Sequence, residues 1–263
     1  MNKQRGLIDA HTHLDYCRTK AEQLIEEAKD AGVVLIIQSG TDLERSRRSV
    51  ELAETFPEVF ATVGFHPHEG GRMNSEGLTW LEKWAAHPRV VGIGETGFDF
   101  YHCRWPREVQ EEVFRRHLDL ARQARLPVVI HTREAVEETL AVLDDYDDLT
   151  IVLHCFSWPH LVDEVVRRGY YVSFAGNVTY KNARALAQAA ENVPETKLML
   201  ETDAPWLSPG PLRGKPNSPA NVRHTYEAVA ALRGTTVEAL AQQIKENVSK
   251  AFPRTAPWLT QAT

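Results

Sequence analysis

Eight short apolar runs, rich in β-branched residues, recur along the chain and alternate with longer amphipathic stretches. The runs cover residues 7–10, 33–39, 59–65, 90–94, 127–130, 150–153, 170–175 and 198–201. Several are continuously hydrophobic, which is typical of strands buried on both faces of a parallel sheet. Alternation of such strands with helices indicates repeated βα units, and eight units close a barrel. The pattern therefore predicts an α/β protein with a single (β/α)8 barrel.

The stretches between these runs have apolar residues at helical spacing, as in Leu24, Ile25 and Ala28. Such helices would form the outer ring of the barrel. Thr235 and Glu238 stand in capping-box spacing before a further apolar face, so we expect an additional C-terminal helix. The 263 residues match the usual length of one barrel domain. We therefore expect a single domain over residues 1–263.

The net charge and the cysteine content indicate how the protein can bind a polyanion and in which compartment it works. The net charge of −6 and the pI near 6.0 exclude a general electrostatic attraction to nucleic acid, so a polyanion must be held locally. Cys17, Cys103 and Cys155 are odd in number and lack Cys-x-x-Cys spacing, which favours a reducing compartment. No run of about 18 apolar residues occurs. We expect a cytoplasmic location, no membrane association and no obligatory protein partner.

Histidines and acids follow six of the eight predicted strands. They are His11 and His13 after the first, His66 and His68 after the third, Glu95 after the fourth, His131 after the fifth, His154 after the sixth and Asp203 after the eighth. Active sites of barrels are assembled at the carboxyl ends of several strands. A lone histidine at such a position is more often a packing or solvent-facing residue than a ligand. Repetition at the same position of so many strands favours a metal site.

His11 and His13 are two residues apart, so an extended strand end directs both imidazoles to the same side. There they can bind one cation. Asp203 offers a further ligand, and its carboxylate can also orient or deprotonate an attacking water.

Glu95 has two oxygens with which it can bridge two cations. Neutral His131 and His154 are suitable nitrogen ligands for zinc, manganese and related ions. Two cations bridged by a carboxylate can activate water and stabilise both the attacking and the displaced oxygen. This arrangement is typical of phosphoester hydrolysis.

Seven sequence blocks now point to a known family. Read in order, they are IDAHTHLD, GFHPHE, GIGETGFDFY, QEEVF over 110–114, LPVVIHTREA, LHCFS and LETDAPWL with a later RGKPNSP. Over nearly the whole chain they resemble the TatD family of metal-dependent deoxyribonucleases. The resemblance implies a TIM barrel with two divalent ions, Mg, Mn or Zn, and a cytosolic location. It also implies cleavage of DNA phosphodiester bonds, with the 3′ ends of single strands as the expected substrate.

The same resemblance implies a division of the ligands between the two ions. One ion would be held by His11, His13, Glu95 and Asp203, and the other by Glu95, His131 and His154, with Glu95 bridging. The catalytic residues would then be Asp203, Glu95 and His66.

His66 lies in the family's HPH block, where it is expected to reach the scissile phosphate. The alternative is that it orients a metal ligand. Arg133, Arg213 and Lys215 are candidates for phosphate contact, because a guanidinium pairs bidentately with phosphate oxygens, although exposed charges are often simply solvated. The last two lie in the irregular stretch 208–219, which contains four prolines and two glycines, and long loops are often functional.

The chain departs from the family pattern at two positions. Trp158 follows HCFS where the family commonly has glycine, and Phe98 stands where leucine is common. Neither change removes a ligand. The bulk of Trp158 beside His154 nevertheless leaves the shape of the substrate open.

Two other functions stay open. One is an amidohydrolase-like ester or lactone hydrolase, including an aminoacyl-tRNA ester hydrolase. Many such enzymes bridge their metals with a carbamylated lysine, yet no lysine occurs between Lys83 and Lys181, and Glu95 takes that place. The other is a catalytically silent scaffold, which the complete set of ligand positions disfavours.

Overall fold

The structure, a computed structural model, describes residues 6–102 and 105–261. In this part of the chain eight strands form one sheet whose order follows the chain from β1 to β8. A helix separates each strand from the next. This connectivity is that of a (β/α)8 barrel, so the predicted fold class is confirmed. Cys103 lies outside the described residues, while Cys17 and Cys155 are present as thiols.

Three strands run further toward their carboxyl ends than the sequence predicted. The strands are β1 (Leu7–Thr12), β2 (Val33–Ser39), β3 (Val59–Val63), β4 (Val90–Asp99), β5 (Val128–Arg133), β6 (Ile151–Leu153), β7 (Tyr171–Phe174) and β8 (Leu198–Leu200). β4 and β5 continue because their pairing extends from Thr96↔Ile130 to Asp99↔Arg133. His11, Glu95 and His131 consequently lie within strand ends and not in the loops that follow them.

The chain divides into two compact units, one comprising residues 1–38 and 155–263 and the other residues 39–154. The expectation of a single domain stays a prediction. The helices of the first unit are α1 (Ala21–Asp30), α6 (Val162–Arg167), α7 (Arg184–Asn192), α8 (Val222–Leu232), α9 (Val237–Ala251) and α10 (Ala256–Gln261). In this unit β1 pairs in parallel with β2, and β7 with β8.

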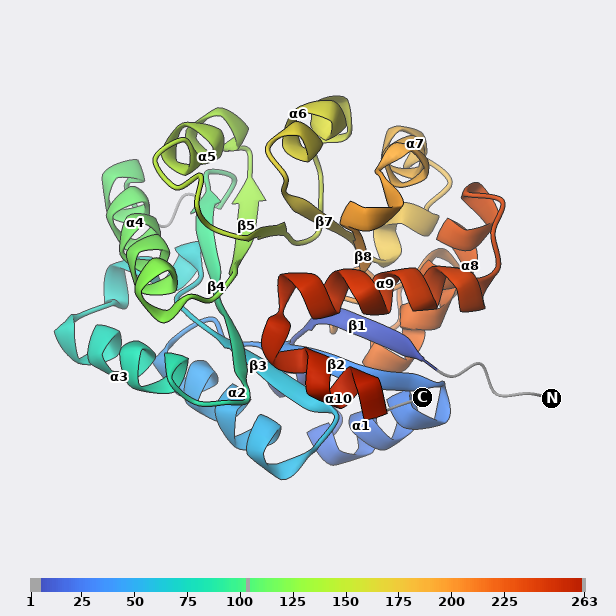
Figure 1. Ribbon diagram of the computed structural model, residues 1–263, viewed down its shortest axis with the longest axis horizontal. Helices are drawn as coiled ribbons and strands as arrows, with labels where there is room; N and C mark the ends of the chain where they lie inside the picture. The colour runs from blue at the N-terminus through green and yellow to red at the C-terminus, as the bar shows by residue number, and fades with distance from the viewer. Residues whose placement is uncertain (1–5, 103–104, 262–263) are drawn as a thin grey trace. The chain divides into compact units, whose positions relative to one another are not determined.

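The C-terminal helices of the first unit pack against its strands. α9 packs against β1 and β8 (Figure 1), so the additional C-terminal helix is present. The predicted cap was wrong by one residue, because the side chain of Thr236 and not Thr235 accepts the hydrogen bond from the backbone N–H of Ala239, at 3.2 Å. Fully buried Tyr226 of α8 accepts from the backbone N–H of Ile8 at 3.1 Å and donates to its carbonyl at 3.2 Å.

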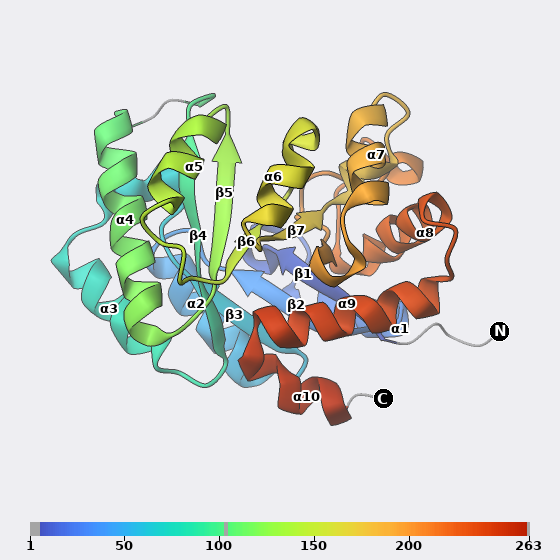
Figure 2. The ribbon, with the colours of Figure 1, turned by 45° about the horizontal axis from the view of Figure 1, so that its top comes forward.

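The second unit contains β3 to β6, which pair in parallel in that order. Its helices are α2 (Leu43–Thr55), α3 (Ser75–Ala85), α4 (Arg107–Ala124) and α5 (Val136–Leu143). α4 runs beside β4 (Figures 1 and 2), and the ring of Phe98 meets that of Phe114 edge-on between them, with both side chains fully buried. The hydrophobic face of the helix thereby holds the strand that carries Glu95.

The end of β3 approaches β4 closely at two glycines. A Cβ atom on Gly64 would lie 2.8 Å from the backbone of Gly94, so a larger residue would push the two segments apart. The Ser46 hydroxyl fixes Gly64 further, because it donates to the Gly64 carbonyl and accepts from its N–H, both at 3.1 Å. The residues next to Glu95 are thus tightly positioned.

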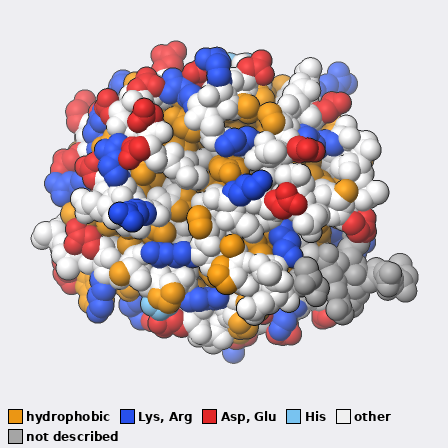
Figure 3. All heavy atoms as spheres, viewed as in Figure 1, with side chains coloured by type: hydrophobic (Ala, Val, Ile, Leu, Met, Phe, Trp, Pro, Cys, Tyr) orange, Lys and Arg blue, Asp and Glu red, His pale blue; other side chains and the backbone are white. Residues whose placement is uncertain are grey.

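Two surface properties bear on possible partners. Among the described helices, none combines the length and the apolar character needed to cross a membrane. On the face drawn in Figure 3, basic and acidic side chains are interspersed, with no broad area of one sign.

Candidate metal centre

The first group of predicted ligands, which we call the β1–β8 cluster, consists of His11, His13 and Asp203. The Nε2 atoms of the two histidines lie 3.1 Å apart. Oδ1 of Asp203 lies 3.9 Å from His11 Nε2 and 3.6 Å from His13 Nε2. Both histidines are almost fully buried, whereas the aspartate side chain is 14% exposed. These three predicted ligands therefore lie side by side in the first unit.

Backbone bonds between the ends of β1 and β8 hold this cluster together. The N–H of Asp203 donates to the carbonyl of His11 at 3.0 Å, and the N–H of His13 donates to the carbonyl of Ala204 at 2.9 Å. Asp203 itself has a φ of 54°, a left-handed conformation that is uncommon for residues other than glycine. Strain of this kind persists only where neighbouring contacts impose it.

The buried side chains of Asp9 and Asn217 impose that conformation through hydrogen bonds to the neighbouring backbone. Asp9 accepts the backbone N–H of Thr202 at 2.8 Å and its hydroxyl at 2.6 Å. Asn217 donates to the carbonyls of Thr202 and Trp206, at 2.9 and 2.7 Å. Together they fasten both sides of the turn that carries Asp203.

The second group, which we call the β3–β6 cluster, consists of His66, Glu95, His131 and His154. One oxygen of Glu95, Oε1, lies 2.9 Å from His131 Nδ1, 2.9 Å from His154 Nε2 and 3.4 Å from His66 Nε2. The Glu95 side chain is only 4% exposed. Three imidazoles from three different strand ends thus converge on one buried carboxylate oxygen.

The protonation of the histidines in this cluster follows from their surroundings. Burial lowers the pKa of His66 well below its ordinary value, and the neighbouring His131 lowers it further. Nδ1 of His66 accepts the backbone N–H of His68 at 3.1 Å, so the neutral ring carries its proton on Nε2. The pKa of His131 is raised, because hydrogen bonds to Asp99 and Glu95 outweigh the effect of burial.

The donor atoms of both clusters fit divalent cations. Two ligands of one tetrahedral ion with bonds of 2.0–2.1 Å lie about 3.3 Å apart. The distances of 2.9 to 3.4 Å around Glu95 are close to this value, and those of the β1–β8 cluster range from 3.1 to 3.9 Å. Imidazole nitrogen with carboxylate oxygen is a donor set suited to zinc and manganese.

A third group, which we call the outer cluster, consists of His68, Asp99 and His102, and the sequence reasoning did not assign Asp99 or His102 a role. Oδ2 of Asp99 lies 2.7 Å from His68 Nε2 and 2.9 Å from His102 Nδ1. It also lies 3.3 Å from His131 Nε2. Asp99 is four residues after Glu95 on the same strand, and side chains at that spacing share a face. This spacing was the signal that could have revealed it.

The predicted phosphate contacts are all exposed, as phosphate binding requires. Arg133 ends β5, and its guanidinium lies 4.8 Å from the ring centre of Tyr101. Arg213 lies 4.5 Å from the ring centre of Tyr180, and Lys215 lies in the same loop. That loop is irregular apart from a short 3-10 turn over Gly210–Leu212. Trp158 and Phe98, the two departures from the family pattern, are both buried.

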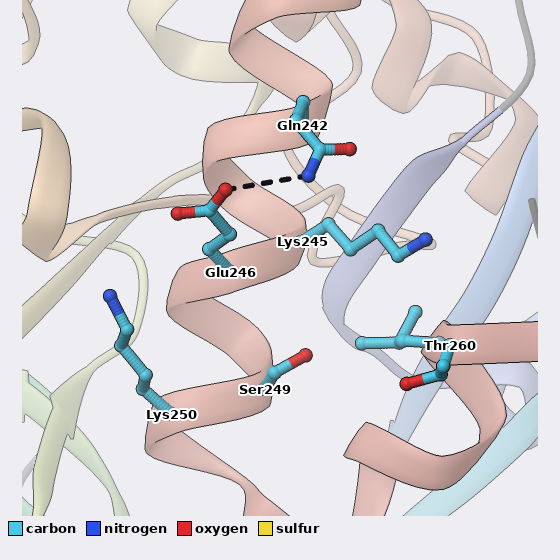
Figure 4. A pocket seen from close by; sticks show the side chains of 7 residues that line it. Gln242, Lys245, Glu246, Ser249, Lys250 and Thr260 are labelled. Carbon is cyan, nitrogen blue, oxygen red and sulfur yellow. Dashed lines mark hydrogen bonds between the residues drawn. The ribbon is translucent and has the colours of Figure 1, made fainter.

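A surface pocket lies between α9 and α10 (Figure 4). Its lining includes Lys245, Lys250 and Glu246, and Glu246 accepts a hydrogen bond from Gln242 at 3.4 Å. Its lining includes neither histidine nor cysteine. The pocket does not offer the donor set of a transition-metal site.

Comparison with known proteins agrees with this donor set. A family model described as TatD related DNase matches residues 8–253. An uncharacterized metal-dependent hydrolase, YabD of Bacillus subtilis, is 35% identical over 251 residues, which cover 94% of this chain and 98% of the relative. A 3'-5' ssDNA/RNA exonuclease TatD of Citrobacter rodentium is 34% identical over 239 residues, with 88% and 91% covered.

Solved structures give the same result. YJJV, a TatD homologue from Escherichia coli, superposes with a TM-score of 0.86 at 27% identity and covers 94% of this chain and 98% of its own. The match of fold and sequence extends over nearly the whole length. The chain therefore belongs to the TatD family of metal-dependent hydrolases.

Proposed function

We propose that the protein is a two-metal phosphodiesterase that removes nucleotides from the 3′ end of single-stranded DNA. The observation that carries the proposal is the buried Glu95, whose Oε1 meets three imidazole nitrogens at the carboxyl ends of the strands. A carboxylate in such surroundings is suited to bridge two cations, and the relative named an exonuclease acts on nucleic acid. We also propose that it works in the cytoplasm.

The proposed ligand assignment divides the two clusters between two ions. One ion would be held by His11, His13, Asp203 and Glu95, and the other by His131, His154 and Glu95. When bound, the two ions supply Lewis acidity and a water of lowered pKa. Support comes from the fold, because active sites of (β/α)8 barrels are built at the strand ends where all these residues stand.

Within this assignment the protein side chains have distinct tasks. Asp203 is the ligand with the most exposed side chain in its cluster, and we assign it the task of orienting or deprotonating the attacking water. His66, neutral at pH 7 with its proton on Nε2, can donate to a non-bridging phosphate oxygen. Arg133, Arg213 and Lys215 are proposed to bind flanking phosphates, because they are exposed cations on strand ends and loops.

Exposed aromatic residues near the clusters favour single-stranded DNA as the substrate. Tyr101 and Trp206 are the large side chains that stay exposed near the clusters, whereas Phe98, Phe156 and Trp158 are buried. Bases stack on exposed aromatic rings without regard to sequence. With a net charge of −6, affinity must come from the ions and a few local cations, which disfavours sliding along duplex DNA.

The proposal is tested with metal-stripped protein and a 5′-labelled single-stranded oligonucleotide. Mg, Mn or Zn is then restored, and the products are resolved by length. A ladder that shortens from the 3′ end is expected, together with loss of activity of at least 100-fold in Glu95→Gln and His131→Ala. Glu22→Gln, an exposed glutamate of α1, is the matched control and should retain wild-type activity.

Four further substrates complete the experiment. RNA of the same sequence shows whether the protein prefers deoxyribose or ribose in its substrate. An oligonucleotide blocked at its 3′ end distinguishes exonuclease from endonuclease action. A lactone and an aminoacyl ester represent the competing reaction. Protein that binds metal and cleaves the esters but leaves DNA intact would refute the nuclease proposal.

A further inference from the structure

In the outer cluster, three imidazole nitrogens surround one carboxylate oxygen. Oδ2 of Asp99 meets His68 Nε2, His102 Nδ1 and His131 Nε2 within 3.3 Å, and its second oxygen accepts the backbone N–H of His102 at 2.9 Å. The aspartate side chain is 1% exposed, the His68 side chain 27% and that of His102 52%. The cluster is therefore anchored in the protein on one side and open to solvent on the other.

The side chains of Gln110 and Trp105 hold the backbone of this cluster in place. Gln110 of α4 accepts the backbone N–H of Asp99 at 2.9 Å and donates to the carbonyl of Trp105 at 2.9 Å. The indole N–H of Trp105 donates to the carbonyl of His68 at 2.9 Å. A Cβ atom on Gly71 would lie 2.4 Å from the Trp105 ring, so this packing needs glycine there. Two of the three residues are thus fixed through their backbones before any ligand arrives.

We propose that His68, Asp99 and His102 bind a third divalent cation through His68 Nε2, Asp99 Oδ2 and His102 Nδ1. The three donor atoms lie within 4.8 Å of one another. Ligands of one tetrahedral ion lie about 3.3 Å apart, so the contacts of 2.7 and 2.9 Å need to open by only about half an ångström. The half-exposed side chain of His102 and the partly exposed side chain of His68 can each provide this movement at their own contact.

The donor set selects the kind of cation. Two imidazoles and one carboxylate favour zinc, manganese or cobalt over magnesium and calcium, which prefer oxygen ligands. Three protein ligands leave positions for solvent, as in open zinc sites, so this ion exchanges more readily than one enclosed by protein.

The position of the cluster suggests what the third ion does. His131 contacts Asp99 through Nε2 and Glu95 through Nδ1, at 3.3 and 2.9 Å, so one imidazole links the outer cluster to the β3–β6 cluster. An ion on the solvent side of His131 is suited to bind a phosphate next to the scissile one. This role in substrate binding rests on the proposed function, whereas the existence of the site does not.

The test measures bound zinc in the intact protein by equilibrium dialysis and elemental analysis over rising free Zn²⁺. His102→Ala is the main variant, because His102 contacts Asp99 and no proposed ligand of the other two ions. His68→Ala is the second variant, and His160→Ala, an exposed histidine of the other unit, is the control for adventitious binding. At saturation, wild type and His160→Ala should bind one ion per chain more than His102→Ala and His68→Ala.

A second readout follows the ions one by one. Protein loaded with ¹¹³Cd should lose one resonance in His102→Ala while the remaining resonances persist. Equal metal content and equal spectra in wild type and His102→Ala would overturn the proposal. Failure of the two-metal centre would lower the total in every protein but leave the difference of one ion, so the two failures are distinguishable.

Discussion

His117 makes the stability of the protein depend on pH in a way that can be calculated. This residue of α4 is 1% exposed, and its ring bridges two backbone groups. Nε2 accepts the N–H of Phe65 at 2.9 Å, and Nδ1 donates to the carbonyl of Val113 at 2.7 Å. Only the neutral ring can make both bonds, because a protonated Nε2 would direct its hydrogen at the N–H of Phe65.

Burial lowers the pKa of His117 from 6.5 to about 4, although the bond to Val113 opposes the shift. Below pH 6.5 the unfolded chain therefore takes up a proton that the folded protein refuses, and unfolding becomes more favourable as the pH falls toward 4. From pH 7 to pH 5 the free energy of unfolding should decrease by about 2 kcal/mol through this residue alone. The corresponding shift in Tm is about 4–8 °C.

The assay compares wild type with His117→Gln by urea unfolding at pH 7 and pH 5, with divalent ions chelated. A glutamine amide can accept from Phe65 and donate to Val113 but does not titrate. The wild type should therefore lose about 2 kcal/mol more than the variant between the two pH values. His160→Gln, at an exposed position, should behave as wild type. Equal losses in wild type and His117→Gln would refute the reasoning.

Three other perturbations test the supports of the proposed site. Asn217→Ala removes two hydrogen bonds to the turn that carries Asp203. The loss should lower the free energy of unfolding by about 1–3 kcal/mol. It should also weaken metal binding, and calorimetry can measure both effects. Tyr226→Phe leaves the N–H and carbonyl of Ile8 without their buried partner, so urea unfolding should show a loss of about 1–3 kcal/mol, and an unchanged midpoint would contradict this. Chelation should lower the Tm of wild type, since an ion at 100 times its Kd contributes about 2.7 kcal/mol per site; an unchanged melting curve would argue against bound ions.

Strand positions and most residues of the candidate clusters could be predicted from local pattern. The run 33–39 was placed with the bounds that β2 has, because a continuously buried strand has a continuously apolar sequence. Predicted ends were less accurate where pairing decides them, as at β4, which continues to Asp99 because β5 offers partners as far as Arg133. Thr236, and not Thr235, caps α9, because the cap depends on where the chain turns into the helix.

The amino-acid sequence by itself determined the (β/α)8 connectivity and the residue types at the strand ends, including His11, Glu95 and Asp203. Both follow from short-range periodicity, since strands alternate every two residues and helices every 3.6. Only the tertiary structure decided that Asp99 collects His68, His102 and His131, and that His117 holds Phe65 across 52 residues. Such contacts depend on how loops and helices pack against the strands, and the spacing of residues along the chain does not encode those distances.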